Sequence, residues 1–143
     1  MDRSLAYTTA AFLALVLTGC PGANYPTCSS KPVTYPGGKC SAYYYQTDYG
    51  SGGVTTQAMT DCKIKAQRLG GNVVAFHTLD HGIGIRWLDA TTLEVAVPTD
   101  TKLEDKRAGD VYLGHKLTYV YRDLTPEDPE FNGCQPKRQA GGT

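Results

Sequence analysis

The chain has 143 residues, a formal net charge of zero and a hydrophobic content of 41%, which fits one domain with terminal tails. A neutral chain lacks the basic face that nucleic acid requires, so we expect no nucleic-acid partner. Ten Tyr residues stand against three Phe residues. Because Tyr favours strands and half-exposed sheet faces, the composition predicts a mainly β domain.

The N-terminal residues have the pattern of an export signal. Residues 1–3 are polar with one basic side chain, and residues 5–17 are mostly apolar. This run is shorter than the roughly 20 apolar residues of a membrane-spanning helix, but it has the length of a signal-peptide core. The sequence therefore predicts a signal peptide over residues 1–19.

The signal ends in Leu17-Thr18-Gly19-Cys20, which resembles the lipobox of bacterial lipoproteins. The resemblance implies cleavage before Cys20, a diacylglyceryl group on its thiol and an acyl chain on the new N-terminus, and we expect no other cofactor. Two or more acyl chains hold a protein on a membrane durably, because each buried CH₂ contributes about 0.8 kcal/mol. A secretory signal cut at another small residue, which would leave Cys20 as a plain thiol, stays open as the alternative.

The cysteines support lipidation by their number. They stand at Cys20, Cys28, Cys40, Cys62 and Cys134, an odd count that is awkward for an exported protein. If Cys20 carries lipid, the other four can pair. A hairpin around the Gly-rich residues 50–53 would place Cys40 opposite Cys62, so we predict the disulfides Cys40–Cys62 and, by elimination, Cys28–Cys134. No CxxC spacing occurs, which disfavours a zinc site at these residues.

Residues 20–39 are predicted to be the lipidated N-terminus and a tether, since Pro, Gly, Ser and Thr dominate them. An ordered extended arm pinned by Cys28 stays open as the alternative. The β domain is expected over residues 40–124. Its first two strands are predicted at residues 40–49 and 54–68, although a helix over residues 57–69 also fits the apolar spacing.

The Gly70-Gly71-Asn72 sequence predicts a turn before a short strand at residues 73–76. The clearest hairpin joins residues 83–87 to residues 93–97. Centring its turn on Ala90 predicts three apolar cross-strand pairs on one face: Trp87 with Leu93, Ile85 with Val95, and Ile83 with Val97. We expect Trp87 to lie at the centre of the core.

The last part of the domain is predicted to be a loop followed by a hairpin. Residues 99–109 are polar and charged, and the hairpin of residues 111–123 would turn at Gly114-His115. Residues 125–143 predict a mostly disordered tail pinned at Cys134. Six or seven strands with short connections predict a small antiparallel meander, as a sandwich or partly open barrel stapled by disulfides.

Three motifs occur in order along the domain. They are an aromatic strand running into a Gly/Thr turn at residues 43–56, a Gly-Asn-Val-Val run at residues 71–74, and an Ile-Arg-Trp-Leu-Asp hairpin ending in Leu-Glu-Val at residues 85–95. Through these motifs residues 71–121 resemble a group of small bacterial lipoproteins and membrane-attached proteins of unknown function. The resemblance implies a β fold and no activity. That group has a Cys in the first turn, where this chain has residues 48–50, so no disulfide pairing is taken from it.

Candidates for chemistry are few. His77, Asp80 and His81 form the only dense group of metal-type side chains in the sequence, and such a set could hold zinc or copper. A polar connection between strands is the simpler interpretation. No GxSxG motif, Cys/His protease pair or phosphate-binding loop occurs. We therefore expect a protein that is not an enzyme.

The tyrosines of the first strand are the candidate interaction surface. Alternation places Tyr43 and Tyr45 on one face and Tyr44 on the other. Aromatic area of this kind suits contacts with an envelope protein or a glycan. The sequence thus favours a membrane-anchored, non-enzymatic binding module of the bacterial cell envelope, with a metal-binding envelope protein as the alternative. Because no Asp follows Cys20, the outer membrane is favoured over the inner membrane.

Overall fold

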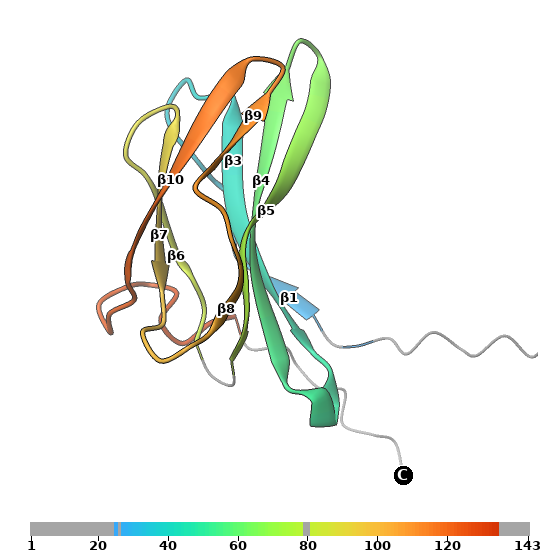
Figure 1. Ribbon diagram of the computed structural model, residues 1–143, viewed down its shortest axis with the longest axis vertical. Coiled ribbons are helices and arrows are strands. Elements are labelled where there is room, and N and C mark those ends of the chain that lie inside the picture. Colours follow the sequence, from blue (N-terminus) through green and yellow to red (C-terminus); the bar gives the residue numbers. More distant parts are fainter. Residues whose placement is uncertain (1–24, 26, 79–80, 135–143) are drawn as a thin grey trace, which may run out of the picture.

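Two β sheets pack face to face in the computed structural model (Figure 1). The structure describes residue 25, residues 27–78 and residues 81–134. Within these ranges the only helical element is one 3₁₀ turn, η1 (Gly50–Gly52), and no helix is long and apolar enough to cross a membrane. The predicted mainly β sandwich is confirmed, and the competing helix over residues 57–69 is wrong.

The first sheet has the strand order β1-β3-β4-β5-β8, and β2 also pairs with β3. Every pairing in this sheet is antiparallel. Its strands are β1 (Thr27–Ser29), β2 (Val33–Thr34), β3 (Cys40–Asp48), β4 (Val54–Ile64), β5 (Gln67–Thr78) and β8 (Leu103–Lys106).

The second sheet has the order β6-β7-β10-β9. Its strands are β6 (Gly84–Trp87), β7 (Thr92–Val97), β9 (Gly109–Tyr112) and β10 (His115–Asp123). Strands β7 and β10 run parallel, so the expectation of a purely antiparallel meander is wrong at this pair. The chain leaves β7, adds β8 to the other sheet and returns, and this long crossover lets β10 run in the same direction as β7.

The β6–β7 hairpin has the predicted register. Trp87 lies opposite Leu93, and Ile85 lies opposite Val95. Leu93 and Val95 are fully buried. Trp87 is 9% exposed and donates a hydrogen bond from its indole nitrogen to the Val33 carbonyl oxygen at 3.0 Å. Trp87 therefore closes one edge of the core rather than forming its centre.

The core lies between the two sheets and takes side chains from both. Its largest fully buried members are Phe76, Ile83, Leu93, Leu117, Val73, Val74 and Val95. Around them pack buried residues of β3 and β4, among them Tyr44 and Ala58. Burial of apolar surface by both sheets is what holds the layers together, at roughly 25 cal/mol per Å².

The turn between β4 and β5 lies earlier than predicted. Lys65 and Ala66 form it with positive φ angles of 50° and 62°, as a two-residue hairpin turn requires. Gly70 and Gly71 instead lie inside β5, where a Cβ atom on Gly70 would come within 2.2 Å of the Thr60 carbonyl oxygen. These glycines allow β4 and β5 to approach each other closely. From the sequence pattern alone, glycines with this role cannot be distinguished from glycines in a turn.

The predicted loop at residues 99–109 is also wrong, because β8 lies inside it and pairs with β5. Along β8, Leu103 and Asp105 are half-buried while Glu104 and Lys106 are exposed. Charged side chains are a common feature of edge strands, because they discourage pairing with other chains. The final hairpin turns at Leu113 and Gly114, with φ angles of 49° and 80°, one residue earlier than predicted.

Both predicted disulfides are present. Cys40–Cys62 joins directly opposed residues of β3 and β4, and Cys28–Cys134 ties β1 to the C-terminal segment. Residues 27–39 form an ordered arm rather than a free tether, since β1 and β2 pair with β3. The predicted signal peptide, Cys20 and residues 135–143 lie outside the described residues.

Candidate interaction surface

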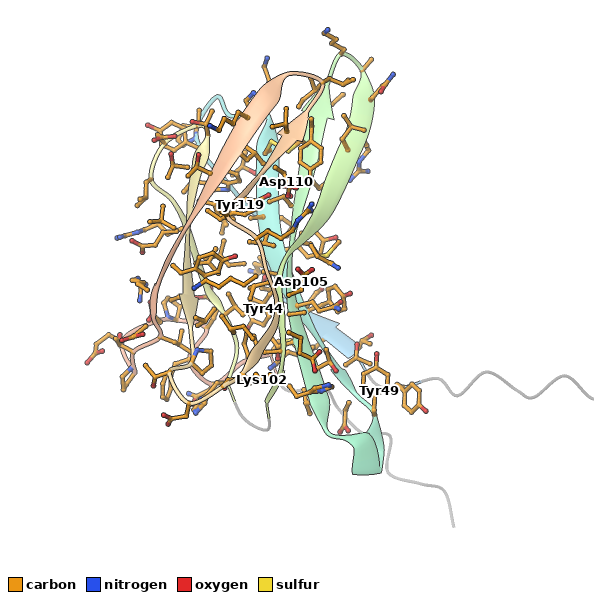
Figure 2. The ribbon with its side chains drawn as sticks, viewed as in Figure 1. Tyr44, Tyr49, Lys102, Asp105, Asp110 and Tyr119 are labelled. Atoms are coloured by element: carbon orange, nitrogen blue, oxygen red, sulfur yellow. A yellow bond between two sulfur atoms is a disulfide. The ribbon has the colours of Figure 1, made fainter. Side chains whose placement is uncertain are left out.

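The three consecutive tyrosines of β3 divide between the two faces of its sheet. Tyr44 is 2% exposed and lies in the core, where burial and, secondly, the charge of Glu130 raise its pKa to about 12. Tyr43 and Tyr45 are half-buried on the opposite face. The predicted alternation is confirmed, but Tyr44 as a surface residue is wrong because its side chain points between the sheets (Figure 2).

The outward tyrosines lie beside uncharged side chains of β4. Tyr43 is opposite Met59, and Tyr45 is opposite Gln57 and donates a hydrogen bond from its hydroxyl to the Gln57 side-chain oxygen. The pKa of Tyr45 is raised first by burial and then by the nearby phenols of Tyr49 and Tyr43. Tyr43 and Tyr45 are two positions apart on β3, so both side chains leave the same outer face of the sheet.

Two further tyrosines extend this row. The rings of Tyr25 and Tyr49 meet edge to face, with centroids 4.7 Å apart and an interplanar angle of 60°. They are 47% and 42% exposed. We call Tyr25, Tyr43, Tyr45 and Tyr49 the tyrosine strip. The Tyr25–Tyr49 contact could not be predicted from the sequence, because it joins residues 24 positions apart and no local pattern marks it.

The outer face of the second sheet carries a network of paired charges. Glu94 accepts hydrogen bonds from Arg86 at 3.1 Å and from Arg122 at 2.8 Å, and Arg122 also donates to Asp128 at 2.5 Å. The hydrogen bonds from Arg122 are the main reason that the pKa of Asp128 falls to about 2. The tyrosine strip differs from this face because its own side chains carry no charge at neutral pH, although the Asp61–Arg68 ion pair lies two residues along β4 from Met59.

A largely buried polar cluster lies towards the end of the sandwich that carries the β9–β10 turn (Figure 2). The Tyr119 hydroxyl donates to Asp110 Oδ2 at 2.7 Å, and Arg107 lies 2.7 Å from Asp110 Oδ1. The Asp110 side chain is only 7% exposed, and burial is the main cause that raises the pKa of Tyr119. The arrangement satisfies a buried carboxylate and links β9 to β10, which is a structural role.

The histidines predicted as metal ligands have separate partners. His77 Nε2 lies 3.1 Å from Glu104 Oε1, and its Nδ1 lies 3.2 Å from the Thr55 hydroxyl. His81 Nδ1 lies 3.1 Å from the Phe131 carbonyl oxygen. Asp80 lies outside the described residues. In the part of the chain that is described, no three His, Cys, Asp or Glu side chains gather as metal ligands would.

A buried glutamine anchors the C-terminal segment beside the His81 backbone. The Gln46 side-chain nitrogen donates to the Thr56 hydroxyl and to the His81 carbonyl oxygen, both at 3.0 Å. Its side-chain oxygen accepts from the Cys134 backbone N–H at 2.8 Å. Gln46 thus bonds to groups from three segments and holds residue 134 next to β3, near the Cys28–Cys134 disulfide.

The fold and this surface define a two-sheet sandwich with an aromatic outer strip. No protein-family model, curated protein or solved structure matches the chain. The resemblance to small bacterial lipoproteins therefore stays an expectation from the sequence motifs alone.

Proposed function

We propose that the mature chain is a lipid-anchored protein of the bacterial cell envelope that acts as a non-enzymatic binding module. One observation carries the anchor. Of the five cysteines in the sequence, the four in the described ranges bond to one another as Cys28–Cys134 and Cys40–Cys62. Cys20 is then the one left over, and it is the cysteine that ends the Leu-Thr-Gly-Cys pattern.

Lipidation would explain why the sequence has one cysteine more than its two disulfides require. Disulfides form and persist in oxidising compartments, where an unpaired thiol tends to form intermolecular bonds. A thioether to a diacylglyceryl group removes the Cys20 thiol from that chemistry. The same group supplies a durable membrane anchor when a second acylation follows. An Asp directly after the lipidated Cys commonly retains lipoproteins at the inner membrane. Residue 21 of this chain is Pro, so the outer membrane is the favoured location.

The two outward tyrosines of β3, Tyr43 and Tyr45, support the binding role. Tyr side chains offer large amphipathic area with only two rotatable bonds, so little conformational entropy is lost on contact. The side chains directly opposite them, Met59 and Gln57, carry no charge, so contact with these two tyrosines removes water from few charged groups. An envelope protein or a glycan fits this chemistry.

Replacing Cys20 tests the anchor. In the producing bacterium the wild-type chain should incorporate labelled fatty acid and resist extraction from membranes by high salt. A Cys20→Ser variant should incorporate none, because its hydroxyl is not a substrate for thioether formation. A Ser29→Ala variant, at an exposed position of β1, is the control and should keep the label. An unlabelled wild-type chain would contradict the proposal.

Replacing the outward tyrosines tests the binding role. Wild-type protein and a Tyr43→Ala/Tyr45→Ala variant are passed over purified peptidoglycan sacculi in one arm and immobilised envelope proteins in the other. We expect the variant to bind at least about tenfold more weakly in one arm, which is about 1.4 kcal/mol and typical of a lost aromatic anchor.

The control for this comparison is Val120→Ala, an exposed apolar residue on β10 that should leave binding unchanged. Equal retention of wild type and the tyrosine variant in both arms would contradict a binding role for these residues.

A further inference from the structure

We propose that the Tyr25–Tyr49 pair is a membrane-contact site. Its rings would lie in the lipid headgroup layer and orient the domain with its η1 end towards the membrane. This inference rests on the proposed lipid anchor at Cys20. It adds an orientation that the anchor alone does not give, because a lipidated N-terminus on a slack tether would leave the domain free to turn.

Chain length keeps the pair close to the bilayer. Tyr25 is five residues beyond Cys20, and a fully extended residue spans at most about 3.6 Å, so the reach is about 18 Å. Beyond Tyr25 there is no slack tether, because β1 (Thr27–Ser29) is already paired with β3. A lipid on Cys20 therefore holds the edge of the folded domain near the headgroups.

The chemistry of the pair suits that depth. Tyr is enriched where membranes meet water, because its ring is apolar while its hydroxyl stays hydrated. Both rings are nearly half exposed, at 47% and 42%. They pack edge to face on each other, which fixes the incoming chain against the end of β3.

The turn that follows Tyr49 has no charged side chain, since residues 49–54 are all uncharged. The carboxylate just before it is turned inward. Asp48 is only 5% exposed and accepts a hydrogen bond from the Gly50 backbone N–H at 2.8 Å. This tip can enter the headgroup layer without the cost of removing water from an ion.

The register of the first sheet then sets the orientation of the whole domain. Thr27 lies opposite Thr47, so the chain enters at the Asp48 end of β3. The other end of β3, roughly 30 Å away for nine residues, bears Lys39, with Lys63 beside it. Figure 1 shows η1 at one end of the sandwich and the β9–β10 turn at the other. We infer that the basic end points away from the membrane.

A fluorescence experiment tests the contact with the full lipidated protein in phosphatidylcholine vesicles that carry nitroxide headgroups. The chain has one Trp, Trp87, which is 9% exposed in the core and gives the background. A Tyr49→Trp variant places a second Trp at the proposed contact. A Val111→Trp variant, at a position 65% exposed on β9, is the matched control near the opposite end.

After the wild-type signal is subtracted, we expect headgroup nitroxide to quench the Trp at position 49 at least about threefold more than the Trp at position 111. Flotation with the vesicles is measured on the same samples. If the protein floats but the two positions are quenched equally, or position 111 more, the membrane contact is wrong while the anchor stands. If the wild-type protein does not float, the anchor fails and this inference fails with it.

Discussion

Removing the Cys28–Cys134 disulfide by a Cys28→Ser/Cys134→Ser double substitution should lower the free energy of unfolding by up to about 4.8 kcal/mol. The two residues are 106 positions apart, and a cross-link over a longer loop removes more entropy from the unfolded chain. Urea denaturation of the folded domain measures the change. Against a usual stability of about 5–15 kcal/mol, this loss is large enough to leave much of the chain unfolded at growth temperature.

The matched control is Cys40→Ala/Cys62→Ala. That bridge spans 22 positions, so loop entropy alone predicts about 3.4 kcal/mol, with a further loss because both side chains are buried. Amide exchange separates the two pairs. The Cys134 N–H bonded to Gln46 should exchange fast only when Cys28–Cys134 is absent. Protection of that amide in the serine variant, or a loss below about 1 kcal/mol, would contradict the account.

A Gly70→Ala substitution should cost at least about 2 kcal/mol. The added methyl group would lie 2.2 Å from the Thr60 carbonyl oxygen and 3.3 Å from the Asp61 Cα atom, and these are backbone atoms that cannot rotate away. The strands β4 and β5 would have to separate at the Asp61–Gly70 pair. Thermal or urea unfolding measures the change.

Gln67→Ala is the control for this prediction, because Gln67 lies on the same strand and is exposed. Its effect should stay within about 0.5 kcal/mol, as for other surface positions. If Gly70→Ala were as mild as this control, the glycine would not be required for close approach of the strands.

The parts of the fold that could be predicted are those set by local alternation. The β6–β7 register follows from apolar residues at every second position, and the Cys40–Cys62 pair follows from a hairpin centred on the Gly-rich turn. The parts that could not be predicted depend on distant segments. The charged segment of β8 forms a strand because it pairs with the edge of the sheet at β5. The parallel β7–β10 pair depends on a chain connection that crosses between the two sheets.

The candidate site shows the same division. Alternation along β3 correctly separates Tyr44 from Tyr43 and Tyr45, but sequence alone does not say which face is buried. The Tyr25–Tyr49 contact could not be found, because one ring comes from a Pro-rich segment that was expected to be a tether. His77 and His81 are close in sequence, yet they bond to Glu104 and Phe131 on different segments.

The most direct test is the intact mass and N-terminal sequence of the mature protein purified from membranes. We predict a chain that begins at residue 20 and weighs more than its amino acids by one diacylglyceryl group and one amide-linked acyl chain. An N-terminus at any other position, with no added lipid, would contradict the account and leave the fifth thiol without an explanation.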